Sequence, residues 1–148
     1  MKKILICFIL FPFLAFTQKQ EKESIYIYFD KVDSKNRILN NNDTKILFYI
    51  NTESDDIFIY NELKHLKKCI EYDSIKFQLI SKTEAKNKLS IRLKKQGEKY
   101  MRETGKKWLP PLSIINYSDY FEKVYIYKKV DSIKGFLYEV DWKYSPIE

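Results

Sequence analysis

The clearest hydrophobic pattern lies near the C-terminus, where apolar and polar residues alternate with a period of two. In residues 136–144, large apolar side chains occupy every second position and charged residues fill most positions between them. Residues 122–130 alternate in the same way. Alternation of this kind is typical of a strand with one buried face. Residues 131–135 form a loop of hairpin length, so the sequence predicts a C-terminal β-hairpin.

The register of this hairpin follows from the same pattern. Directly opposed residues of an antiparallel pair point to one face, so apolar residues must lie opposite apolar ones. Pairing Val130 with Phe136 satisfies this condition along both segments. In this register Tyr127 lies opposite Glu139 on the other, more polar face.

Three further strands are predicted nearer the N-terminus. Residues 24–30 alternate, with tyrosines on the outward face. Residues 44–50 are apolar on both sides, which favours a central strand covered twice. Residues 74–80 carry apolar side chains on one side. The polar, Asn-rich residues 30–43 indicate a hairpin loop.

A first helix is indicated by apolar residues spaced four, three and four apart, which places them on one helical stripe. These residues are Ile59, Leu63, Leu66 and Ile70. The alternative is a short strand at residues 57–60, followed by a helix that begins at Asn61.

A second helix is indicated more strongly, because Ser81 and Glu84 match a capping box. An apolar stripe from Ala85 follows, and the helix is expected to end at Gly97 or to run on to Gly105. The fold class is therefore α+β. We expect one mixed or antiparallel sheet of about five strands, with two helices on one face, in a single domain over residues 18–148.

The first residues of the chain are typical of a targeting segment and not of an element of the folded core. Lys2 and Lys3 precede a run of 13 apolar residues at 4–16, and the chain turns polar from Gln18. The run is too short to span a membrane, which takes roughly 20 residues. The pattern predicts a secretory signal peptide at 1–17, cleaved before Gln18, with export to the periplasm or the extracellular space. The alternative is an uncleaved N-terminal anchor.

Export changes how cysteine and charge are interpreted. Cleavage would remove Cys7 and leave Cys69 as a single thiol, which excludes an internal disulfide and favours a buried cysteine. It would also leave 25 basic and 20 acidic residues. Only three of the basic residues are arginine, whose planar group dominates nucleic-acid recognition, so nucleic acid is disfavoured as a partner.

Few residues support catalysis or metal binding. His65 is the one histidine, and with Cys69 it supplies too few ligands for a zinc site, so no metal and no cofactor are expected. Glu139 and Asp141 project from one strand face two residues apart. Paired carboxylates of this kind serve glycoside hydrolases, although a solvated sheet face carries the same pattern.

Two surfaces are candidates for binding. One is a tyrosine face of the sheet, formed by Tyr26, Tyr28, Tyr125 and Tyr127. The other is a basic band on the second helix, followed by an exposed Trp108. The band comprises Lys88, Arg92, Lys95, Lys99 and Arg102, within about 80° of the helix circumference.

The sequence therefore predicts an exported, non-enzymatic domain that binds an envelope component or a partner protein through the tyrosine face or the basic band. No transmembrane span is expected after cleavage, but peripheral contact with a membrane or an anionic polymer fits the charge. The alternative is an envelope polysaccharide hydrolase that uses Glu139 and Asp141. A third interpretation is that the helices cover the tyrosine face, which would leave neither sheet site.

Overall fold

A computed structural model describes residues 22–40, 44–51, 56–109 and 116–144. The predicted signal peptide at 1–17 lies outside the described residues. Within them the chain is mixed α+β, as predicted, but the sheet has eight strands and not about five. The strands are β1 (Ile25–Phe29), β2 (Arg37–Asn40), β3 (Lys45–Tyr49), β4 (Asp56–Asn61), β5 (Lys67–Glu71), β6 (Leu79–Ile80), β7 (Val124–Lys129) and β8 (Lys134–Tyr144). The helices are α1 (Tyr72–Ile75), α2 (Lys82–Thr104) and the 3-10 helix η1 (Tyr117–Tyr120).

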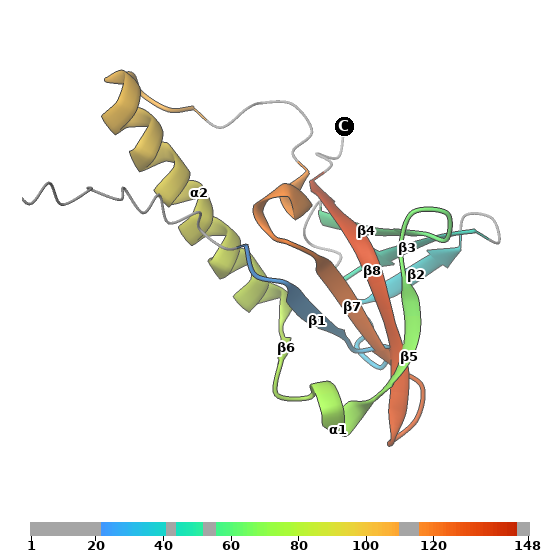
Figure 1. The fold of residues 1–148 in the computed structure, drawn as a ribbon. Helices are drawn as coiled ribbons and strands as arrows, with labels where there is room; N and C mark the ends of the chain where they lie inside the picture. Colours follow the sequence, from blue (N-terminus) through green and yellow to red (C-terminus); the bar gives the residue numbers. More distant parts are fainter. Residues whose placement is uncertain (1–21, 41–43, 52–55, 110–115, 145–148) are drawn as a thin grey trace, which may run out of the picture.

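The long strand β8 organises the sheet (Figure 1). Neighbouring strands follow the order β2-β3-β4-β8-β7-β1-β6, and β5 also pairs with β8. The first part of β8 pairs with β5 and its last part pairs with β4, both antiparallel. At the other end of this order, β6 is parallel to β1, and β1 is parallel to β7.

The predicted C-terminal hairpin is confirmed as β7 and β8, but its register differs by two residues. Lys128, not Val130, lies opposite Phe136. The turn is responsible, because the Asp131 carboxylate accepts two backbone N–H groups at 2.8 and 2.9 Å and closes a shorter loop. A shift by two residues keeps every side chain on its predicted face, so the alternation still holds.

The first predicted helix is wrong. The chain forms β4, then a polar turn, then β5 in this region. The alternative strand at 57–60 is confirmed, but the helix that was to begin at Asn61 is absent. Leu63 and Leu66, which the helical stripe required to be buried, are exposed in the turn. Pairing of both strands with β8 satisfies their backbone groups and overrides the helical spacing.

Two other expectations along the chain are corrected. The predicted loop at 30–43 contains β2, which pairs with β3. The strand β3, predicted to be central, lies next to β2 near one end of the strand order, and β8 is nearer the centre. The predicted strand at 74–80 is instead the end of α1, a turn at 76–78 and the short β6, and Phe77, which was expected to share one strand face with Ile75 and Leu79, is 91% exposed.

The second predicted helix is confirmed as α2. Ser81 Oγ accepts the Glu84 N–H at 3.1 Å, and the Glu84 carboxylate accepts the Ser81 N–H at 2.8 Å, which completes the capping box. The helix passes Gly97 and ends at Gly105, whose φ is 67°. Gly97 is needed for space, because a Cβ there would lie 2.9 Å from the Trp108 ring.

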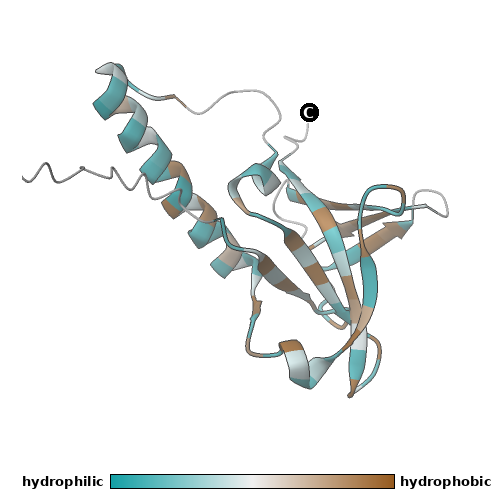
Figure 2. Ribbon diagram, viewed as in Figure 1, coloured by the Kyte–Doolittle hydropathy of each residue, from teal (hydrophilic) through white to brown (hydrophobic). Residues whose placement is uncertain are grey.

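The core lies on both faces of the sheet, and the expectation of two helices on one face is wrong. The main cluster joins α2, through Ala85 and Leu89, to the buried face of β1, β7 and β8. A smaller cluster on the opposite face joins Ile75 of α1 to Tyr127 and Leu137. The helix α2 extends well past the sheet, and its far end is largely hydrophilic (Figure 2). Among the described residues, no helix is both long and apolar enough to cross a membrane.

Because Tyr117 of η1 is packed against the sheet, the free energy of unfolding should fall at alkaline pH. Burial raises the pKa of the Tyr117 phenol to about 12, with a smaller contribution from the nearby Asp56 carboxylate. The unfolded phenol ionises near pH 10, so this stabilisation is complete below about pH 10 and is lost as the pH rises to about 12. Between about pH 9 and pH 11, the chain should lose about 1 kcal/mol more stability than a Tyr117→Phe variant. Urea unfolding at both pH values measures this, and equal losses would contradict it.

Candidate functional site

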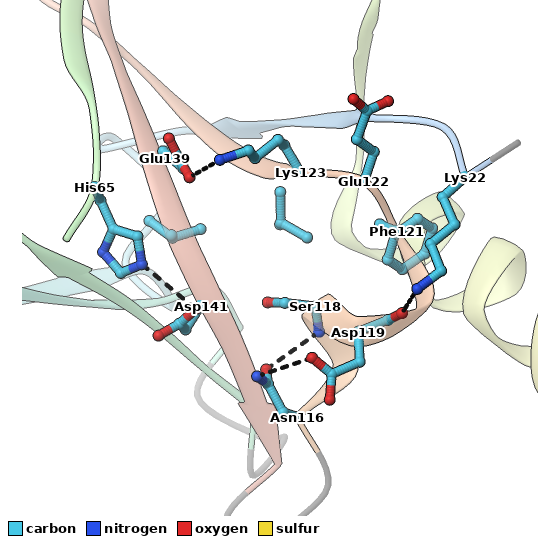
Figure 3. Close-up of a pocket in the computed structure, with 12 residues that line it drawn as sticks. Lys22, His65, Asn116, Ser118, Asp119, Phe121, Glu122, Lys123, Glu139 and Asp141 are labelled. Carbon is cyan, nitrogen blue, oxygen red and sulfur yellow. Dashed lines mark hydrogen bonds and ion pairs between the residues drawn. The ribbon is translucent and has the colours of Figure 1, made fainter.

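The two carboxylates predicted as an alternative catalytic pair line one cleft. Glu139 and Asp141 of β8 border a hollow of about 380 Å³. Asn116 and Ser118 border it from the side of η1, and Lys123 borders it just before β7 (Figure 3). The hollow arises because β8 continues beyond the start of β7. Val124, the first residue of β7, pairs with Val140, so β7 does not cover the side of β8 beyond that point.

The Glu139 carboxylate makes two contacts within the protein. The Glu139 side chain is 10% exposed. One carboxylate oxygen forms an ion pair with Lys123 Nζ, and the other accepts the Leu66 N–H at 3.4 Å. The hydrogen bond to Glu139, helped by its charge, raises the pKa of Lys123 above the usual range. The carboxylate therefore fastens the turn between β4 and β5 to β8.

Asp141 is held in a similar way by the same turn. Its carboxylate lies 3.4 Å from His65 Nε2 and 3.6 Å from Lys64 Nζ. His65 Nδ1 accepts the Asn61 N–H at 2.9 Å, so this nitrogen carries no proton and the ring proton is assigned to Nε2, which faces Asp141. Both nitrogens of the single histidine are thereby engaged.

These contacts weaken the case for hydrolysis. A general acid must present its proton to the leaving oxygen, and a nucleophile or base needs an accessible carboxylate oxygen. Glu139 has a donor on each oxygen, and Asp141 has two partners. The register also places Tyr125, not Tyr127, opposite Glu139. The structure explains both carboxylates as supports for a turn.

His65 and Cys69 do not share an element, because Cys69 lies in β5 and His65 lies in the turn before it. Its thiol is exposed, contrary to the expectation of burial. Among the described residues, no three His, Cys, Asp or Glu side chains gather closely enough to hold a metal ion.

The tyrosine face is largely covered. Tyr127 is fully buried beneath the segment that contains β5 and α1, so the expectation that it is open to a ligand is wrong. Tyr26 and Tyr125 stack on each other, with ring centroids 5.1 Å apart, and are half-buried, as is Tyr28. This arrangement resembles the third interpretation, in which the tyrosine face is covered. The cover, however, consists of a β-strand and a short helix and not of the two predicted helices.

The basic band on α2 divides into two parts. Lys88 and Arg92 bind the Glu23 carboxylate at 3.1 and 3.3 Å, and Arg92 also lies over the Phe121 ring. Burial alone would raise the pKa of Glu23, but hydrogen bonds and charge from Lys88 and Arg92 outweigh it and lower the pKa. These two cations dock the segment before β1 onto the helix.

The second part of the band remains exposed. Lys95, Lys99 and Arg102 lie on the half of α2 that leaves the sheet. Among the described residues, the one ion pair in this group joins Lys99 to Glu103 at 3.9 Å and is largely exposed, so it contributes little. Within the described part of the chain, Lys95 and Arg102 form no ion pair. We call these three residues the exposed basic band.

A groove of about 290 Å³ runs between this band and η1. Lys95 and Lys99 line it from α2, while Lys22 and Tyr120 line it from other segments. Sequence reasoning missed Lys22 and Tyr120, because no local pattern links a residue before β1 and a residue of η1 to the helix.

Trp108, predicted to be exposed beside the band, is elsewhere. Its half-buried ring packs on Gly97. At 100° per residue, Gly97 lies about 160° around the helix from both Lys95 and Lys99. The tryptophan and the exposed basic band therefore occupy opposite flanks of α2 and cannot form one contact surface.

Comparison of the chain with family models, with curated proteins and with solved structures finds no match.

Proposed function

We propose that this chain is an exported, non-enzymatic domain that binds an acidic component of the cell envelope through the exposed basic band of α2. Export rests on the signal peptide predicted at 1–17. One observation carries the binding surface: Lys95, Lys99 and Arg102 stay exposed on a projecting helix, while Lys88 and Arg92 of the same band are used by Glu23.

The geometry of the band suits an extended anion. The three cations share one side of α2, and the rise of 1.5 Å per residue separates Lys95 from Arg102 by about 10 Å along the axis. A chain of acidic groups lying along the helix would meet each cation in turn. Association would be favoured by long-range attraction and weakened by salt, because exposed charges are screened.

The alternative, a polysaccharide hydrolase, has one observation in its favour, namely that Glu139 and Asp141 share a cleft. The protein's own donors occupy both carboxylates, so we favour binding without catalysis.

Charge reversal of the exposed basic band tests the proposal. The chain without residues 1–17 is mixed with isolated cell envelopes at low salt, and the bound fraction is measured by sedimentation. Changing Lys95, Lys99 and Arg102 to Glu should lower the affinity about tenfold or more, at about 0.5 kcal/mol for each reversed contact. Added salt should weaken binding of the unchanged chain.

The matched control changes Lys31, Lys68 and Lys134 to Glu, three exposed lysines away from α2. It alters the net charge by the same amount and should retain most of the binding. Equal losses in the two variants would mean that net charge alone drives binding, and no loss in either would refute the role of the band.

A further inference from the structure

We infer that the groove between α2 and η1 binds an acidic sugar unit of a polysaccharide. This inference rests on the proposed function and names the chemical class of the acidic component. It depends on three features of the groove, which are its cations, its neutral polar and aromatic groups, and its size.

The cations come from two sides. Lys95 and Lys99 stand one turn apart on α2, and Lys22 stands in the segment before β1. Lys22 Nζ donates to the Asp119 backbone oxygen at 2.7 Å, which fixes its ammonium at the side of the groove next to η1. Arg92 closes the groove and is itself held by Glu23 and Phe121. A carboxylate, sulfate or phosphate group placed here would face several positive charges, of which Lys22 and Arg92 are held in place by other contacts.

The remaining lining residues favour a sugar over other anions. Tyr120 is half-buried and is the one aromatic residue among those that line the groove. Its ring offers a flat apolar surface for the C–H face of a sugar. Gln96 adds hydrogen-bonding groups for hydroxyls.

The single aromatic residue disfavours nucleic acid as the occupant of the groove, because single-stranded nucleic acid is usually held by stacking of successive bases on several aromatic residues. A chain of Asp or Glu residues has no sugar ring to place on Tyr120 and no hydroxyls for Gln96. A sugar that carries both an acidic group and hydroxyls can contact the lysines, Tyr120 and Gln96 together.

The size of the groove fits one ring rather than an oligosaccharide. Its volume of about 290 Å³ lies just below the range of about 300–1,000 Å³ for small-ligand sites. The rest of a polymer would run along the exposed basic band toward Arg102, so the groove would select the sugar and the band would hold the chain.

Calorimetric titration with three polymers tests the inference. Polygalacturonate supplies acidic sugars, polyglutamate of similar charge density supplies acid groups without sugar, and dextran supplies neutral sugar. The chain without residues 1–17 should bind polygalacturonate at least about fivefold more tightly than polyglutamate, a difference of about 1 kcal/mol. Dextran should bind far more weakly than either.

Variants locate the site. Tyr120→Ala should weaken polygalacturonate binding about fivefold and leave polyglutamate binding unchanged, since the lost contact is with the ring. Tyr120→Phe keeps the ring and should retain most of the affinity. Gln96→Ala, on an exposed helix position where alanine is tolerated, is a second test if Tyr120→Ala does not fold. Either variant should lower only the binding of polygalacturonate.

The outcomes separate this inference from the proposed function. Equal affinity for polygalacturonate and polyglutamate, with no effect of Tyr120→Ala or Gln96→Ala, would overturn the sugar site while the basic band stands. Tighter binding to single-stranded DNA or to anionic lipid vesicles than to polygalacturonate would overturn it as well. No binding to any polyanion would refute both proposals.

Discussion

Replacing Asp56 with alanine is expected to lower the free energy of unfolding by about 3–5 kcal/mol. Asp56 opens β4 and is 1% exposed. One of its carboxylate oxygens lies 3.3 Å from Lys82 Nζ and 2.8 Å from Lys86 Nζ, both in the first turns of α2. The carboxylate thus fastens the start of the helix to the strand.

The large effect follows from what the substitution leaves behind. Lys82 is buried, and its ammonium also donates to the Ile50 backbone oxygen at 2.6 Å. Burial lowers the pKa of Lys82, and the Asp56 carboxylate acts against that shift. Without the carboxylate, the buried ammonium of Lys82 loses a negative charge 3.3 Å away, and this loss costs more than an exposed ion pair gains.

Urea unfolding measures the effect, and Lys86→Ala is the matched control. Lys86 contacts the same carboxylate oxygen, but its side chain is 44% exposed, so its loss should cost about 1 kcal/mol or less. A loss below about 1 kcal/mol for Asp56→Ala would show that Asp56 does not anchor the helix.

The second large effect is expected for Tyr127→Ala, at about 3–5 kcal/mol. The side chain is fully buried in the smaller cluster, against Ile75 and Leu137. Its hydroxyl lies 3.5 Å from the Ile70 backbone oxygen, a distance at the limit of hydrogen bonding, so the loss would come mainly from the cavity. The substitution would loosen the segment that covers this face of the sheet.

Tyr125→Ala provides the comparison for this face. Tyr125 is half-buried and stacks on Tyr26, so its removal should cost only about 1 kcal/mol. Thermal unfolding of the two variants measures the difference. A small, equal loss for both would mean that Tyr127 is accessible, and the tyrosine face would again be a candidate for binding.

Local signals predicted the elements that depend on few neighbours. The capping box at Ser81 and Glu84 marks the start of α2, because both bonds form within one turn. The alternation at 136–144 identifies β8 and its faces, because side chains on a strand alternate whatever its partners are. It could not fix the register, since Asp131 closes the turn two residues shorter than the apolar pattern required.

The helix expected through Ile59 and Ile70 shows where local spacing fails. The same residues fit a helical stripe or two short strands, and only the pairing of both strands with β8 selects the second. The roles of Glu139 and Asp141 were ambiguous for a related reason. Their partners Leu66 and His65 come from a turn more than 70 residues earlier in the chain.

The sequence by itself determined the α+β class, the helix α2 and the basic residues along one of its sides, because periodicity and capping act within a few residues. The tertiary structure decided which of those cations remain exposed, since Glu23 takes up Lys88 and Arg92. It also created the groove, by bringing Lys22 and Tyr120 against α2. Contacts between residues so distant along the chain depend on packing of the whole domain, which no local pattern encodes.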